Sequence, residues 1–237
     1  MDKIKQITTD QGRLYEIEGV GAFPSVTTIL GGTSDKSFLF RWRQRVGVEE
    51  ANRISKYASG RGNCMHQLLE KYMVSEKKPR ITKKWINTQL KNFESTGQDA
   101  KDSGISLFKK FLNDDFLGRI DETLANEVFL WSKVGFAGAV DNVSRMKDGS
   151  IKVIDFKSST KVKREEWVQD YFLQVAAYSI AYWERTGTKP DGAEIWISTE
   201  PEEVPQNFKM TFEDIRHYFT LFKERLDIFN SKTLKSQ

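Results

Sequence analysis

Residues 123–157 constrain the fold more than any other part of this chain, because their apolar pattern predicts three successive β-strands. The segments are rich in β-branched and aromatic residues, which favour strands. Asp148-Gly149 lies between the last two segments and is a strong signal for a tight hairpin turn. We therefore expect an antiparallel arrangement of consecutive strands. The three strands are expected at residues 123–131, 136–146 and 150–157.

The chain before these strands reads as mostly helical. Residues 13–20 alternate weakly and predict one strand of a small hairpin, and either Ser25 or Thr28 is suited to cap a short helix. Further on, apolar residues recur at spacings of three and four, which is the helical period. Gly60 and Gly62 interrupt this period, so we expect one helix to end before them and another to begin there. The expected helices cover residues 36–58, 62–74, 82–97 and 101–117.

The chain after these strands alternates between helix and strand. Residues 165–185 have an amphipathic helical pattern, and residues 193–198 form a short apolar run typical of a strand. A last helix is expected at residues 212–230, where Thr211 and Asp214 resemble a capping box. Helix, three strands, helix and strand is the element order of an α+β protein.

The length of 237 residues fits one domain, because no linker rich in proline, glycine or serine divides the chain. We expect a single domain over residues 1–237, with a mostly helical part to about residue 118 and the core from about residue 119. The formal net charge of +4 is too small to identify a nucleic-acid-binding protein by itself.

The single cysteine, Cys64, excludes an intramolecular disulfide and a four-cysteine iron–sulfur cluster within one copy. The N-terminus has neither the apolar region of a signal peptide nor the arginine-rich start of a transit peptide. No apolar run approaches the roughly 18 residues that a membrane-spanning helix needs. These observations predict a soluble, cytoplasmic protein of a bacterium or a phage-infected cell, with no membrane partner.

Acidic residues and a lysine lie on the three expected strands. Asp155 and Lys157 share a face, because strand residues i and i+2 point the same way. Asp141 follows a Gly-x-x-Asp step that begins at Gly138, and Glu127 lies one strand earlier. Carboxylates in such a group can hold Mg²⁺ or Mn²⁺, which can set a water against a phosphodiester. An Asp-x-Lys sequence alone is common as a surface ion pair, so it is the combination that indicates a site.

The order of several motifs resembles a known nuclease family. His66 lies on an expected helix, Gly138-x-x-Asp141 and Asp155-x-Lys157 follow on strands, and Gln174-x-x-x-Tyr178 lies on a later helix. This order is similar to the RecB-like branch of the PD-(D/E)xK nuclease superfamily. The resemblance implies a restriction-endonuclease-like core, with a mixed sheet of about four strands flanked by helices. The segments Pro24–Leu30, Arg41–Arg45, Gly62–His66 and Asp155–Ser159 further resemble the mitochondrial genome maintenance exonuclease family with its phage and bacterial relatives.

The resemblance also implies a metal site for Mg²⁺ or Mn²⁺. Its ligands would be Asp141, Asp155 and the backbone carbonyl of Phe156. His66 would be a further metal ligand or a substrate contact, in place of an ordinary helix-surface histidine. Glu127 would be a ligand or an acid beside the ligands, and the alternative for it is an exposed strand position.

The catalytic residues that the resemblance implies are Lys157, Gln174 and Tyr178, together with the two aspartates. Neighbouring carboxylates oppose any lowering of the Lys157 pKa, so we favour electrostatic positioning over a general-base role for this lysine. Gln174 and Tyr178 are one helical turn apart and both can face the sheet. The alternative is a core tyrosine with a solvated glutamine beside it.

Basic, hydroxyl and aromatic residues around these motifs are candidates for binding nucleic acid. Lys161, Lys163 and Arg164 follow the last of the three strands, directly after Ser158 and Ser159, which can donate to phosphate. The alternative for the basic cluster is a solvated charged face. On an upstream helix, Trp42 is suited to stack on a base and Arg45 to hold a phosphate, although Trp42 fits a core position almost equally well.

These features together predict a metal-dependent DNA exonuclease, and the resemblance implies a preference for single strands or flaps with a free end. The rival among enzymes is a structure-specific flap endonuclease. The rivals outside enzymes are a non-catalytic nucleic-acid-binding subunit and a protein-interaction module that keeps only the fold. The presence of Asp141, Asp155 and Lys157 together favours an intact catalytic site.

Overall fold

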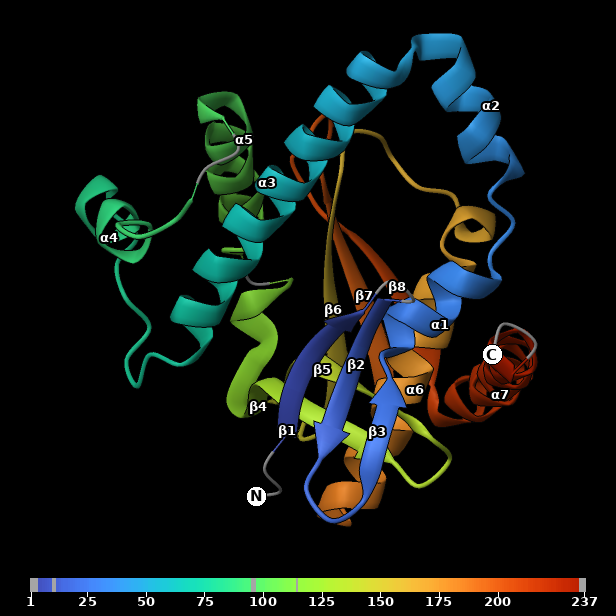
Figure 1. Ribbon diagram of the computed structural model, residues 1–237. Helices are drawn as coiled ribbons and strands as arrows, with labels where there is room; N and C mark the ends of the chain where they lie inside the picture. The colour runs from blue at the N-terminus through green and yellow to red at the C-terminus, as the bar shows by residue number, and fades with distance from the viewer. Residues whose placement is uncertain (1–3, 10–11, 95–96, 114, 235–237) are drawn as a thin grey trace.

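The computed structural model describes residues 4–9, 12–94, 97–113 and 115–234, and its centre is a five-stranded mixed sheet (Figure 1). The strand order is β4-β5-β6-β7-β8, in which β6 and β7 pair in parallel and the other neighbours pair antiparallel. This arrangement confirms the expected α+β class with a mixed sheet. The strands are β4 (Ile120–Ser132), β5 (Phe136–Met146), β6 (Ile151–Ser159), β7 (Gly192–Thr199) and β8 (Gln206–Thr211).

The three consecutive strands predicted at residues 123–157 are confirmed as β4, β5 and β6, and Gly149 in the turn between the last two has a φ of 85°. The fifth strand, β8, was not predicted. It lies at the edge of the sheet and buries only Met210 fully, so its sequence lacks the apolar run that marks a central strand. The sheet therefore has one strand more than the expected four.

Helices cover both faces of the sheet. Neighbouring residues of β6 point to opposite faces and therefore pack against different helices. Val153 packs with α6 and α7 on one face, and Ile154 and Phe156 pack with α3 and α5 on the other. Among the helices of the described residues, none combines the length and hydropathy needed to cross a lipid bilayer. The helices are α1 (Val26–Thr33), α2 (Ser37–Val46), α3 (Val48–Met73), α4 (Lys83–Gln89), α5 (Gln98–Lys110), α6 (Gln169–Thr186) and α7 (Phe212–Leu234), with short 3₁₀ turns η1 (Leu117–Arg119) and η2 (Glu165–Trp167).

The N-terminal residues form a second, three-stranded antiparallel sheet. The prediction of one hairpin strand is thus correct but incomplete, because this segment contributes three strands. Tyr15 and Ile17 of this sheet are buried against Trp131 and Ala137. Ser25 caps the following helix, since its hydroxyl accepts from the backbone N–H of Thr28 at 2.9 Å. The strands are β1 (Ile4–Thr9), β2 (Gly12–Ile17) and β3 (Gly21–Pro24).

Helix α3 corrects the expected break at Gly60 and Gly62, because it runs through both glycines without interruption. The chain turns instead at Gly47, which has a φ of 86° and separates α2 from α3. A Cβ at Gly62 would lie 3.4 Å from Ser158 Oγ, so the helix passes close to β6. Burial of the α3 face offsets the cost of about 1 kcal/mol that each helical glycine carries. His66 is thereby held in the middle of a long helix.

The remaining helices agree with the predicted ones in number, with different ends. The helices expected at residues 82–97 and 101–117 are present as the shorter α4 and α5, and residues 95, 96 and 114 of those predictions lie outside the described residues. The start of α7 is a reciprocal cap, as predicted. Asp214 accepts from the backbone N–H of Thr211 at 2.8 Å, and Thr211 Oγ1 accepts from the backbone N–H of Asp214 at 3.2 Å.

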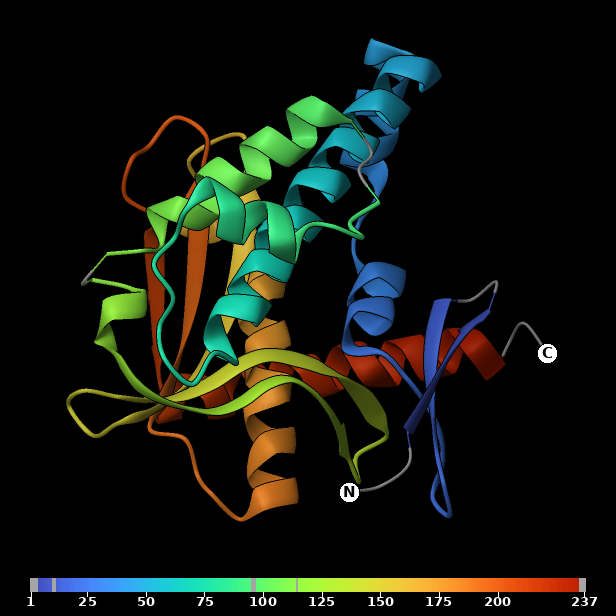
Figure 2. The same cartoon turned by 90° about the vertical axis from the view of Figure 1, so that its left-hand side faces the viewer.

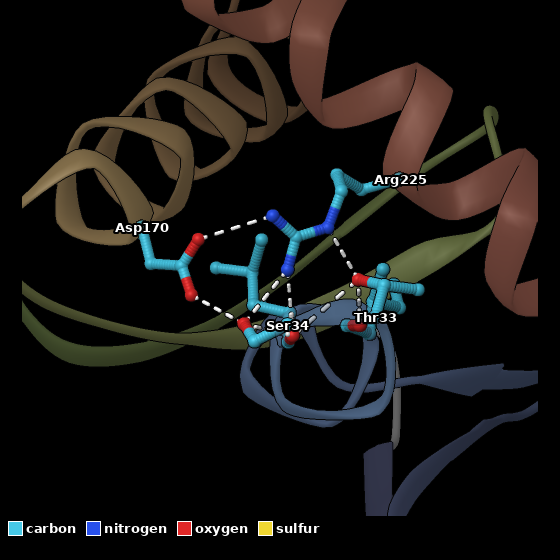
Figure 3. Close-up of polar contacts among 6 residues, drawn as sticks. Thr33, Ser34, Asp170 and Arg225 are labelled. Atoms are coloured by element: carbon cyan, nitrogen blue, oxygen red, sulfur yellow. Dashed lines mark hydrogen bonds and ion pairs between the residues drawn. The ribbon is translucent and has the colours of Figure 1, made fainter. Parts of the chain in front are cut away.

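Arg225 of α7 joins α1 to α6 (Figure 3). Its guanidinium donates to Thr33 Oγ1 at 2.5 Å, and to the carbonyl of Leu30 and the hydroxyl of Ser34 at 2.8 Å each. It also donates to Asp170 Oδ1 at 3.2 Å, and Ser34 donates to Asp170 Oδ2 at 2.6 Å. The last helix therefore satisfies the open carbonyl end of α1 and holds it against the first turn of α6.

The contact between α3 and α5 gives a stability prediction. A Cβ at Gly104 would lie 2.6 Å from Cys64 Cβ and 2.7 Å from the backbone oxygen of Arg61, so Gly104→Ala must push the two helices apart. We expect a loss of about 1–3 kcal/mol in the free energy of unfolding, measured by denaturant titration. The matched control is Gly31→Ala, because Gly31 is also helical but has open space around it. Equal stability of the two variants would contradict this close packing.

Candidate active site

The site begins where β5 leaves β6. These strands pair over Asn142–Arg145 and Ile151–Ile154, and the pairing stops next to Asp141 and Asp155. Beyond this point the carboxylate of Asp141 takes the place of a backbone partner, because its Oδ2 accepts from the N–H of Phe156 at 2.8 Å. The divergence of the two strands thus opens a space at the sheet and holds Asp141 at its edge.

Three potential ligand atoms converge at this opening. His66 comes from α3, Glu127 from β4 and Asp141 from β5, and one ligand atom of each lies within 4.8 Å of the others. His66 Nδ1 is 3.7 Å from Asp141 Oδ2. The sequence thus predicted three residues that the fold brings together from distant segments.

Glu127 has a strained backbone at this point. Its φ is 51°, and no other non-glycine residue among the described ones has a positive φ. A conformation of this kind costs about 1–3 kcal/mol and persists where the surrounding structure imposes it. The flanking pairs Asn126–Asn142 and Val128–Val140 keep their register, so the strain is confined to the residue that contributes the carboxylate.

The buried Asp155 and the half-buried Lys157 form an ion pair beside this cluster. Asp155 is only 1% exposed, and Lys157 Nζ lies 2.5 Å from its Oδ2. Gln174 of α6 donates to Asp155 Oδ1 at 3.1 Å. Apart from the lysine contact, Asp155 Oδ2 has no hydrogen-bond partner among the described residues. Gln174 is therefore buried and hydrogen-bonded to Asp155, whereas the alternative from the sequence was a solvated glutamine.

Tyr178 connects the helix motif to the Gly-x-x-Asp motif. Its ring is 4% exposed and packs within the core beneath the sheet. A Cβ at Gly138 would lie 2.7 Å from Tyr178 Cε1 and 2.9 Å from its hydroxyl oxygen, so only glycine leaves room for this ring. The glycine of the motif is thereby explained by tyrosine packing, and Tyr178 is both a core residue and a neighbour of the site.

The pKa values of the site reflect crowded negative charge. Burial, and then the neighbouring Asp141, raise the pKa of Asp155 to about 7, although Lys157 opposes this. Desolvation by surrounding atoms, and then Asp141, raise the pKa of Glu127 to about 8, although the residue as a whole remains exposed. Burial alone would lower the pKa of Lys157, but Asp155 and Asp141 outweigh it and raise that pKa. Burial lowers the pKa of His66, which therefore stays neutral near pH 7.

These properties fit a divalent cation. Glu127 and Asp141 share the opening with Asp155 adjacent, and desolvation, followed by the neighbouring negative charge, raises the pKa values of Glu127 and Asp155. A neutral imidazole and carboxylate oxygens are suitable ligands for Mg²⁺ or Mn²⁺. The residues that could hold the ion are His66, Glu127 and Asp141, with Asp155 adjacent.

The other predicted residues lie at the end of β6, on the segment that follows it, and on α2. Ser158 faces Gly62 of α3, and the hydroxyl of Ser159 donates to the carbonyl of Lys161 at 2.6 Å, where it closes a turn. Lys161 and Arg164 are exposed, and Lys163 is half-buried, on the segment that leaves β6. Trp42 is half-buried and Arg45 is exposed on α2, a helix without buried residues that projects at the top of Figure 2.

Sequence reasoning missed Tyr171 of α6. Lys157 Nζ lies over its ring, 5.1 Å from the centroid, and the ring is half-buried. Tyr171 precedes Gln174 by three residues and Tyr178 by seven, so all three share one helical face. This spacing was a signal that could have identified it. Glu70 was missed as well; it lines, with His66 and Glu127, an open hollow of about 470 Å³.

The sequence model of the PD-(D/E)XK nuclease superfamily matches residues 36–232. Among solved structures, the chain is similar to a protein from Eubacterium rectale that is provisionally described as an exonuclease, with 11% identity and a TM-score of 0.48. That match covers 72% of this chain and 68% of the other. No curated protein sequence matches this chain.

Proposed function

Because this chain belongs to the PD-(D/E)XK nuclease superfamily, we propose that it is a metal-dependent deoxyribonuclease that removes nucleotides from the ends of single strands or flaps. The observation that carries the proposal is the meeting of His66, Glu127 and Asp141 beside the ion pair of Asp155 and Lys157. In a charge cluster with a purely structural role, hydrogen-bond and cationic partners would keep the pKa of each carboxylate low. Here the pKa values of Glu127 and Asp155 are raised.

Metal binding in the proposed reaction falls to four side chains. His66, Glu127, Asp141 and Asp155 would hold Mg²⁺ or Mn²⁺, which supplies Lewis-acid stabilisation of a phosphoryl oxygen and a nucleophilic water at neutral pH. The hydrogen bond from the Phe156 N–H fixes Asp141 Oδ2 in place. The carbonyl of Phe156 remains a predicted ligand that the family resemblance suggests.

Lys157 would act through its charge. Its raised pKa keeps it protonated near neutral pH, so it is suited to orient the attacking water and to offset charge that develops on the phosphate. Gln174 and Tyr178 would position this pair: Gln174 donates to Asp155, and Tyr178 packs on Gly138 beneath the opening. Ser158, Ser159, Lys161, Lys163 and Arg164 would guide the phosphate backbone that leaves the site.

The preference for single strands is supported by the exposed helix α2. Its aromatic and basic side chains, among them Trp42 and Arg45, are not buried in the fold. Aromatic rings that stack on bases and arginines that hold phosphates are the usual means of binding an unpaired strand. A duplex hides its base faces, so it would make less use of this helix.

Cleavage of end-labelled single-stranded DNA tests the proposed function. We expect labelled mononucleotides or short products with Mg²⁺ or Mn²⁺, and none with EDTA, because the carboxylates need the cation to act. A circular single strand of the same composition is the matched substrate. Cleavage of the circle at the same rate would indicate a flap or structure-specific endonuclease, and no cleavage of either substrate would contradict the proposal.

A further inference from the structure

Trp167 is an exposed tryptophan on the segment that joins β6, the strand of Asp155 and Lys157, to α6. Its side chain is 58% exposed, whereas tryptophan is usually highly buried. It ends the short 3₁₀ turn η2, directly before α6, the helix that carries Gln174 and Tyr178. An exposed indole at this place is available to a ligand, since it offers a large aromatic face with a polar N–H.

The backbone around Trp167 is firmly anchored. The next residue, Val168, is fully buried, and its N–H donates to the carbonyl of Glu165 at 3.1 Å. Upstream, Lys163 and Gln206 of β8 exchange two hydrogen bonds, at 2.7 and 2.8 Å. The indole is therefore presented by a fixed segment, which lowers the entropy that a ligand must remove on binding.

Two contacts between a cation and an aromatic ring lie on this part of the chain, one at the proposed site and one at Trp167. Lys157 Nζ lies 5.1 Å from the ring centroid of Tyr171, which is one helical turn after Trp167. The N–H of Tyr171 donates to the carbonyl of Val168 at 2.9 Å, so this turn is continuous. At the second contact, the guanidinium of Arg164 lies 5.2 Å from the ring centroid of Trp167.

We propose that Trp167 is the stacking platform for an unpaired base of the substrate strand, next to the nucleotide whose phosphate enters the site. This inference deepens the proposed nuclease function and rests on it. The ring carries the interaction with the base, while Arg164, which lies 3.7 Å from Glu166, belongs to the basic segment proposed to guide the phosphate backbone. Every base has a π face, so the platform selects unpaired strands without selecting a sequence.

Substitution of the ring tests this inference through binding, without any need for cleavage. In EDTA, the affinity for a fluorescent single-stranded 12-mer should fall roughly 10-fold in Trp167→Ala and largely recover in Trp167→Phe, which keeps an aromatic face. The matched control is Trp183→Ala, because Trp183 is a 39% exposed tryptophan at the other end of α6 whose ring packs against Phe212. It should bind like the wild type.

A set of oligonucleotides, each lacking the base at a different position, identifies the stacked base. Wild-type affinity should drop when one particular position lacks its base, and Trp167→Ala should be insensitive at that same position. A wild type that binds in this pattern but does not cleave DNA would contradict the nuclease function and leave the platform intact. Unchanged affinity in Trp167→Ala, or identical abasic profiles in both proteins, would overturn the platform and leave the nuclease function intact.

Discussion

Asp141→Asn and Asp155→Asn should each lower the rate of DNA cleavage by roughly 10³-fold or more, because each removes a negative charge that holds the cation. Asparagine tests the charge of Asp141 specifically, because its carbonyl oxygen can still accept from the Phe156 N–H and the strands keep their geometry. Binding of single-stranded DNA should persist in both variants, because phosphate contacts elsewhere supply most of the affinity.

Loss of the metal site in these two variants can also be measured without cleavage, through the thermal stability of the protein. An ion that binds only the folded protein stabilises it by about 2.7 kcal/mol at a concentration 100 times its Kd, so Mn²⁺ should raise the melting temperature of the wild type. The rise should be absent or much smaller in the two variants. Asp121→Asn is the matched control, because Asp121 is an exposed aspartate near the start of β4. Undiminished Mn²⁺-dependent cleavage in both aspartate variants would disprove the metal site.

Lys157→Ala should reduce cleavage on the order of 10²–10³-fold, similar to the removal of other positioned electrostatic groups. The lysine ammonium lies 2.5 Å from Asp155 and over the ring of Tyr171, so a charge is fixed at one place beside the proposed metal ligands. Lys157→Arg keeps the charge with an altered shape and should retain measurable activity. The two variants are compared by single-turnover cleavage at saturating Mg²⁺.

A general-base role for Lys157 predicts a different outcome. Arginine releases its proton too reluctantly to act as a base, so Lys157→Arg and Lys157→Ala would then be equally inactive. The wild-type rate would also rise with pH in the same range with Mg²⁺ and with Mn²⁺, whereas the pKa of metal-bound water depends on the metal. Equal inactivity together with a metal-independent pH profile would overturn the electrostatic role.

The central strands and the spacing of the site residues were predictable because local rules determine both. Alternating apolar residues and the Asp148-Gly149 turn fix β5 and β6 as neighbours, and period-two alternation places Asp155 and Lys157 on one face. Gln174 was indicated by the motif that it shares with Tyr178 and by the resemblance of that motif to a nuclease family. The strand features depend on contacts between segments that are close in the chain.

Features set by distant contacts were not predictable. The helical propensity of glycine suggested a break at Gly60 and Gly62, but packing of α3 on β6 and α5 outweighs that preference. No sequence rule assigns a positive φ to Glu127, since the surrounding strands impose it. The need for a glycine at position 138 becomes visible only when the ring of Tyr178, forty residues later, is placed against it.

The contacts by which Arg225 joins α1 to α6 have a consequence for synthesis on the ribosome. The first helix, α1, buries Val26, Ile29 and Leu30 in a core that includes Phe222 and Leu226 of the last helix. In a growing chain, the part of this core contributed by α7 is missing until almost two hundred further residues have been added after α1. The contacts of the Arg225 guanidinium with α1 do not exist before then either, so α1 reaches its final packing only after α7 has been added.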